Sequence, residues 1–209
     1  VEIEAGASIG VAMSTPELLK SESAADAAVT LLRSADTAMY RAKQRGRGRS
    51  ELYSEDMRTA ARARQTLASE LEQALAGNQF AVVFQPIESA HTGRVVAAEA
   101  LLRWNHPTRG LLAPGAFLDL ADESGLIAPI GDWVLNESAR TIAEWISTEL
   151  VDRGMAIHVN ASRRQLSDIT FVDRALTILR DNNLEGSQLV FETSEATLVD
   201  NNPSVLRTV

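Results

Sequence analysis

Apolar residues over the second half of the chain fall into two alternating patterns. Short apolar runs predict strands at residues 80–87, 95–102, 155–161 and 189–191. Stretches with the apolar spacing of amphipathic helices lie between the later runs, at residues 115–122, 130–150 and 170–181. Strands that alternate with helices are typical of a parallel sheet. The pattern therefore predicts an α/β fold for this part of the chain.

A different arrangement precedes these runs. Residues 7–14 form a short β-prone run, and apolar positions at helical spacing follow over residues 24–33 and 35–45. We expect Ser34 to cap the start of the second helix and Gly46 to end it. This part therefore predicts a strand followed by two helices.

One long helix is predicted over residues 54–76. Its apolar stripe includes Leu67, Leu71 and Leu75. We interpret this helix as a connector whose stripe packs onto the following domain. The alternative is that the stripe pairs with a second copy of the chain.

Composition and charge exclude several classes of function. The chain has 20 Lys and Arg against 28 Asp and Glu, a net charge of −8, and no Cys. An acidic surface argues against wrapping a nucleic acid polymer or docking on an anionic membrane. The absence of Cys excludes disulfides, thiolate metal sites and thiol nucleophiles, and suits a cytoplasmic location. No apolar run is long enough to span a bilayer. The chain starts at Val1 without a leader, so we expect it to be a piece of a longer protein.

Polar side chains lie at or near the ends of the predicted strands. They are Gln85, Glu99, Arg103, Asn160, Glu192 and, just beyond, Glu195. In a (β/α) barrel the carboxyl ends of the strands form the active face, so these groups are expected around one mouth. Two carboxylates and an amide oxygen are ligands that Mg²⁺ or Mn²⁺ prefers, and an arginine supplies paired donors for a phosphodiester.

The sequence of residues 99–104, Glu-Ala-Leu-Leu-Arg-Trp, followed by His106-Pro107, resembles the signature of the EAL-domain cyclic di-GMP phosphodiesterases. Other motifs of that family occur in order around it, at residues 84–87, 114–127, 130–135, 159–166 and 192–195. The resemblance covers residues 67–209. It implies a modified (β/α)₈ TIM-type barrel, of which about the first four strands are present.

The resemblance also implies a reaction and a site. In this family, metal ions held by the residues matching Glu99, Asn160 and Glu192 activate a water that opens cyclic di-GMP to linear pGpG. The residues matching Gln85, Leu101 and Arg103 line the binding site for cyclic di-GMP, and the catalytic residues are those matching Glu99 and Glu195. The implied cofactor is Mg²⁺ or Mn²⁺, the implied partner is cyclic di-GMP, and a homodimer through this domain or the long helix is an open alternative.

The first residues resemble the end of a GGDEF-domain diguanylate cyclase. The resemblance lies in residues 7–12 and residues 35–47. The family residues matching Lys43 and Arg47 contact nucleotide phosphates, and their spacing of four places both on one helical face. Because the chain has no Gly-Gly-Asp/Glu-Glu-Phe motif, we expect this phosphate contact to be vestigial here. The resulting division is a cyclase remnant over residues 1–53, a linker helix over 54–66, and an EAL-like domain over 67–209.

Two departures from the family pattern limit what this chain can do alone. It has no Asp-Asp pair and no Lys after Lys43, so the family's later metal ligands and catalytic lysine are absent from it. Arginine stays protonated and cannot replace that lysine as a base. We therefore expect a phosphodiesterase in the complete protein and an inactive chain in isolation. The alternatives are a degenerate receptor that binds cyclic di-GMP without cutting it, and a purely structural fragment.

His158 is the other unusual position. It shares strand parity with Asn160 and should face the same side of the sheet. We interpret it as a packed, hydrogen-bonded histidine rather than as a ligand neighbour.

Overall fold

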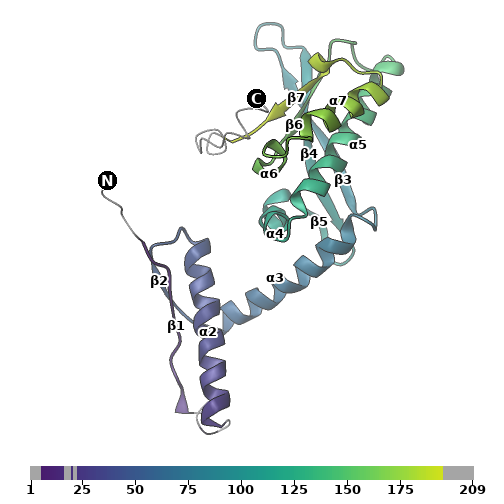
Figure 1. Cartoon of the computed structure of the whole chain (residues 1–209). Helices are drawn as coiled ribbons and strands as arrows, with labels where there is room; N and C mark the ends of the chain where they lie inside the picture. Colours follow the sequence, from purple (N-terminus) through teal and green to yellow (C-terminus); the bar gives the residue numbers. More distant parts are fainter. Residues whose placement is uncertain (1–5, 17–19, 21–22, 195–209) are drawn as a thin grey trace. The chain divides into compact units, whose positions relative to one another are not determined.

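The computed structural model describes residues 6–16, 20 and 23–194. The chain divides into two compact units, residues 1–67 and 68–209 (Figure 1). Within the described residues, every helix is too short or too polar to cross a membrane.

The first unit is built on a strand, a helix and a strand. Strand β1 (Ile9–Val11) pairs in parallel with β2 (Ser50–Leu52), and the long helix α2 (Ala24–Gln44) connects them. The helix lies so close to β1 that a Cβ atom on Gly10 would overlap the backbone of Ala35 and Met39. Glycine at this position is therefore required by packing.

Helix α2 corrects the expectation of two separate helices. Ser34 is internal, and the N-cap is Ser23, whose hydroxyl accepts a hydrogen bond from the Asp26 backbone N–H at 3.2 Å. Serine inside a long helix costs only a few tenths of a kcal/mol against alanine, so Ser34 does not break it. The helix does end before Gly46, which has a φ of +106°.

Helix α3 (Glu55–Ala74) runs from the first unit into the second. In the second unit its Leu71 is fully buried, which supports packing of the stripe within that unit. Glu70 adds a polar anchor, since its carboxylate accepts a hydrogen bond from Nε2 of the buried His106 at 2.9 Å. Backbone N–H groups donate to Nδ1 of His106, which places the ring proton on Nε2.

A mixed sheet forms the centre of the second unit. Its strands lie in the order β3 (Phe80–Glu88), β4 (Val95–His106), β6 (Ala156–Asn160) and β7 (Leu189–Glu192), and β5 (Gly110–Leu112) pairs with the end of β4. The parallel arrangement predicted from the sequence holds for β4, β6 and β7. It is wrong for β3, which is antiparallel to β4. Residues 89–94 are too short for a crossover and form a hairpin turn instead.

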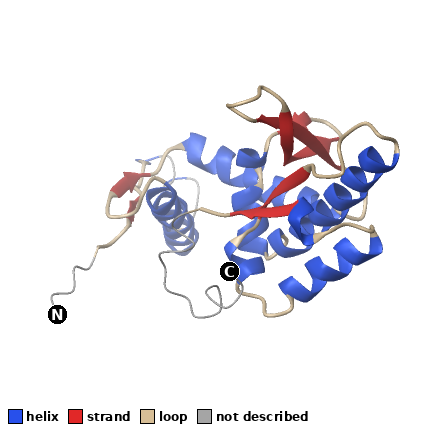
Figure 2. Cartoon of the chain, turned by 90° about the horizontal axis from the view of Figure 1, so that it is seen from above, coloured by secondary structure: helices blue, strands red, loops and turns tan. Residues whose placement is uncertain are grey.

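Helices pack on this sheet and connect its strands (Figure 2). They are η1 (Pro114–Ala116), α4 (Leu118–Ser124), α5 (Ile127–Ser147), α6 (Arg163–Leu166), α7 (Phe171–Asp181) and η2 (Gly186–Gln188). Aromatic rings fill the core between β3, β4 and the helices: Trp104 lies 6.1 Å from Phe80 and 5.5 Å from Phe117, measured between centroids. The helices thereby cover one face of the sheet and leave the other for polar groups.

A charged network fixes the start of α7. The carboxylate of Asp168 accepts from the Thr170 backbone N–H at 2.9 Å and from Arg174 Nη1 at 2.7 Å. These donors favour the ionised form and lower the pKa of Asp168 to about 2. Arg174 also pairs with Asp132 of α5 at 3.1 Å, so the network connects α7 to α5. Because the pKa is lowered on folding, its stabilising effect is present above the ordinary value of 3.8 and is lost as the pH falls toward 2.

Candidate functional site

Alternation along β4 separates two faces of the sheet. Ala98, Ala100, Leu102 and Trp104 are buried under the helices, whereas the residues between them are only partly buried. The strands on either side extend this second face. We call it the polar face, and its members are Gln85, Glu99, Leu101, Arg103, His158, Asn160 and Glu192.

Strand register brings these side chains together. Gln85 is opposite Glu99, Glu99 is opposite His158, and Asn160 is opposite Glu192. The expectation that these groups lie at or near the carboxyl ends of parallel strands is wrong for Gln85 and Glu99. Glu99 lies in the middle of β4, and Gln85 reaches it through the antiparallel hairpin.

Glu99 and Asn160 are in direct contact. The Asn160 side-chain amide donates to Glu99 Oε1 at 2.8 Å. Two adjacent ligands of an octahedral Mg²⁺ ion are about 3 Å apart, so this spacing fits a shared cation once the amide turns its oxygen inward. The donor set of two carboxylates and one amide is the hard-oxygen type that Mg²⁺ and Mn²⁺ take.

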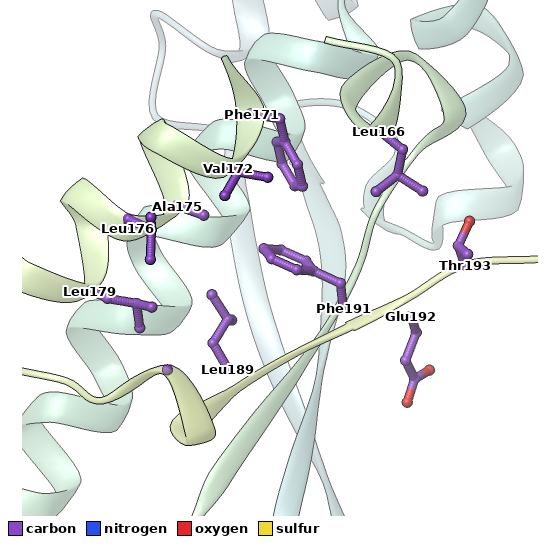
Figure 3. Close-up of a pocket in the computed structure, with 11 residues that line it drawn as sticks. Leu166, Phe171, Val172, Ala175, Leu176, Leu179, Leu189, Phe191, Glu192 and Thr193 are labelled. Carbon is purple, nitrogen blue, oxygen red and sulfur yellow. The ribbon is translucent and has the colours of Figure 1, made fainter. Parts of the chain in front are cut away.

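Glu192 is held by His158. Nδ1 of His158 lies 2.7 Å from Glu192 Oε1. Figure 3 shows the Glu192 side chain directed away from the apolar groove between β7 and α7, whereas its neighbour Phe191 points toward α7. His158 is hydrogen-bonded, as predicted, but its partner Glu192 is a predicted metal ligand, so His158 is also the ligand neighbour that the prediction set aside.

Arg103 and Leu101 lie farther along the same face. Arg103 Nη1 donates to the Leu102 carbonyl oxygen at 2.8 Å, so the guanidinium has a backbone partner. Leu101 and Asn160 line a cavity of about 380 Å³ between the sheet and helices α4 and α5. This cavity is mostly apolar and adjoins the Glu99–Asn160 pair.

Comparison with known proteins places this arrangement in a family. The family model described as "EAL domain" matches residues 68–209. The chain belongs to the EAL-domain family. We call the second unit, residues 68–209, the EAL unit, and it contains every residue of the polar face.

Relatives extend the comparison over both units. The bifunctional diguanylate cyclase/cyclic di-GMP phosphodiesterase MucR of Pseudomonas aeruginosa is 39% identical over 167 residues, which are 80% of this chain and 24% of MucR. The cyclic di-GMP phosphodiesterase PdeR of Escherichia coli is 34% identical over 211 residues, 100% of this chain and 30% of PdeR. The chain therefore spans less than a third of either relative.

A solved structure shares the architecture. The structure of the MucR phosphodiesterase in complex with c-di-GMP has a TM-score of 0.64 and 37% identity, and the match covers 68% of this chain and 57% of that chain. The EAL unit therefore has the fold of the corresponding part of this neighbour.

Three predicted site residues remain: Glu195, Lys43 and Arg47. Glu195 lies outside the described residues. Lys43 and Arg47 belong to the first unit, and the expectation that they share a helical face is wrong: α2 ends at Gln44, and Arg47 follows it with a φ of +57°. Among the residues that the structure describes, no group of three or more His, Cys, Asp or Glu is arranged to hold a metal ion.

Proposed function

We propose that the chain is part of a cyclic di-GMP phosphodiesterase whose EAL unit opens the cyclic dinucleotide to linear pGpG. The single observation that carries this proposal is the Glu99–Asn160 hydrogen bond, with Glu192 opposite Asn160 on the neighbouring strand of an EAL fold. Two relatives named as cyclic di-GMP phosphodiesterases, and a solved neighbour with c-di-GMP bound, support the choice of substrate.

Each residue of the polar face has a task in this proposal. Glu99, Asn160 and Glu192 would hold Mg²⁺ or Mn²⁺, which supplies a water of lowered pKa and neutralises charge on the phosphate. Arg103 offers the paired N–H donors that match phosphate oxygens, and its reach is adjustable because its hydrogen bond within the described residues goes to a neighbouring backbone carbonyl. Gln85 contributes an amide opposite Glu99, and Leu101 contributes apolar contact to a base. Glu195 is proposed to support the site as a second catalytic carboxylate.

The described strands fit the first part of a TIM-type barrel. Parallel pairing of β4, β6 and β7, with a helix between successive strands, is the repeating unit of such a barrel. The open groove of about 690 Å³ between β7 and α7 lies where a further strand and helix would continue it. Because the Asp-Asp pair and the lysine of the family are absent from this sequence, the activity is proposed for the full-length protein.

Removing divalent metal is expected to abolish hydrolysis. The full-length protein should convert cyclic di-GMP to pGpG with Mg²⁺ or Mn²⁺, and EDTA should reduce turnover to background because the charge on the phosphate is then unopposed. Chromatography of the nucleotides measures the product, and re-addition of Mn²⁺ controls for damage to the protein. Binding of cyclic di-GMP without any turnover would instead favour a receptor. The absence of both binding and turnover would contradict both functions.

We also propose that the first unit is the end of a diguanylate cyclase domain. The alignment with PdeR covers the whole chain, and MucR is named as a bifunctional cyclase and phosphodiesterase. The proposal gives the exposed Lys43 and Arg47, next to the end of α2, a role in nucleotide phosphate binding.

This role predicts weaker GTP binding after Lys43→Ala in the full-length protein. Loss of one charged donor to phosphate should reduce affinity by about tenfold or more, measured by calorimetry. Arg33→Ala, which removes an exposed cation elsewhere on α2, is the matched control. Equal affinities for the Lys43 variant and the wild type would argue against a phosphate-binding role.

A further inference from the structure

Strand β6 holds both acidic residues of the proposed site by crossed hydrogen bonds. In register, Glu99 is opposite His158 and Glu192 is opposite Asn160. The side-chain hydrogen bonds do not join these opposite residues but run diagonally between the strands: Asn160 donates to Glu99 at 2.8 Å, and His158 bonds to Glu192 at 2.7 Å. Each carboxylate therefore has one partner on the central strand.

The proton on the His158 ring can be assigned from its partner. An ionised carboxylate only accepts hydrogen bonds, so Nδ1 carries the proton that it donates to Glu192. The short distance of 2.7 Å is typical of a bond strengthened by charge. Nδ1 is thereby committed to the carboxylate and is not a metal ligand.

Glu192 has a particular need for such a partner. Its side chain is 41% exposed, whereas that of His158 is 23% exposed. A glutamate side chain samples several rotamers, and these must be restricted before the carboxylate can bind a cation. The bond to His158 restricts them in advance, because the ring has only two rotatable bonds and lies on the inner strand.

We infer that His158 is a positioning residue that holds the Glu192 carboxylate in place for a divalent cation on the polar face. This inference rests on the proposed function and deepens it, since it adds a nitrogen donor beside an all-oxygen ligand set. Mg²⁺ and Mn²⁺ favour oxygen ligands, so a histidine in this place serves them better as a donor to a carboxylate than as a ligand.

The test separates the hydrogen bond from the shape of the ring. In the full-length protein, His158→Phe keeps a ring without a donor, and His158→Asn keeps an N–H near the position of Nδ1. Titration with Mn²⁺ alone, followed by the electron paramagnetic resonance signal of the free ion, measures metal affinity without any turnover. We expect His158→Phe to weaken Mn²⁺ binding by about 10–100-fold and His158→Asn to recover most of it.

Controls make each outcome decisive. His91→Phe, which changes an exposed residue in the 89–94 turn, should leave Mn²⁺ affinity unchanged. Thermal unfolding of each variant checks the fold. If His158→Phe does not fold, His158→Ala replaces it. Unchanged affinity in both donor-free variants would overturn the inference. Recovery by His158→Gln but not by Asn would also overturn it, since Gln presents its amide near Nε2 and direct ligation would then be indicated.

The inference and the proposed function fail differently. A wild type that binds Mn²⁺ but does not hydrolyse cyclic di-GMP would contradict the phosphodiesterase while the Phe and Asn variants still decide the role of His158. A wild type that binds no Mn²⁺ would overturn both.

Discussion

Replacing Glu99 by Gln is expected to lower cyclic di-GMP turnover by the full-length protein on the order of 10²–10³-fold, the range typical of losing one preorganised electrostatic group in an active site. The substitution keeps the size of the side chain and an oxygen that can accept from Asn160, whose amide now donates to Glu99 at 2.8 Å. It removes one negative charge from the proposed ligand set. Metal affinity and turnover should therefore fall while the fold persists.

Glu88→Gln is the matched control for this experiment. Glu88 lies at the far end of β3, is exposed, and is opposite Val95 rather than any residue of the polar face. Initial rates at saturating Mn²⁺ and at limiting Mn²⁺ should be measured for both variants. A Glu99→Gln protein with wild-type rates at both concentrations would remove Glu99 from the site and contradict the proposed chemistry.

The sequence predicted most of the secondary structure of the second unit because its signals are local. Apolar runs and helical spacing located β3, β4, β6, β7, α5 and α7 within a few residues. The direction of β3 was missed because it depends on the length of the connection: six residues permit a hairpin and exclude a crossover. The single helix α2 was missed because Ser34 resembles a cap in isolation, whereas no Gly or Pro interrupts the residues around it.

The contacts of the polar face were harder to predict because they cross between strands. Family motifs indicated Glu99, Asn160 and Glu192, and parity placed His158 on the same side as Asn160. The diagonal pairing of His158 with Glu192 depends on the register of β6 with β7, which no single-strand pattern contains.

Gly10→Ala is expected to disrupt the first unit. The added Cβ would overlap the carbonyl oxygen of Ala35 and the backbone of Met39 on α2. Backbone atoms in the middle of a long helix cannot move aside as the end of a flexible side chain can, so α2 must separate from β1. Ala38 and Ala42, which are fully buried on α2, would then lose packing.

The expected destabilisation is about 3 kcal/mol, at the upper end of the range for overpacking because the obstacle is backbone. Hydrogen exchange measures it directly: amides of α2 and β2 should lose protection in the Gly10→Ala protein. Gly6→Ala is the control, since a Cβ there has no atom within 4 Å. Retained protection of α2 after Gly10→Ala would contradict this prediction, because it would show that β1 and α2 leave room for a Cβ atom at position 10.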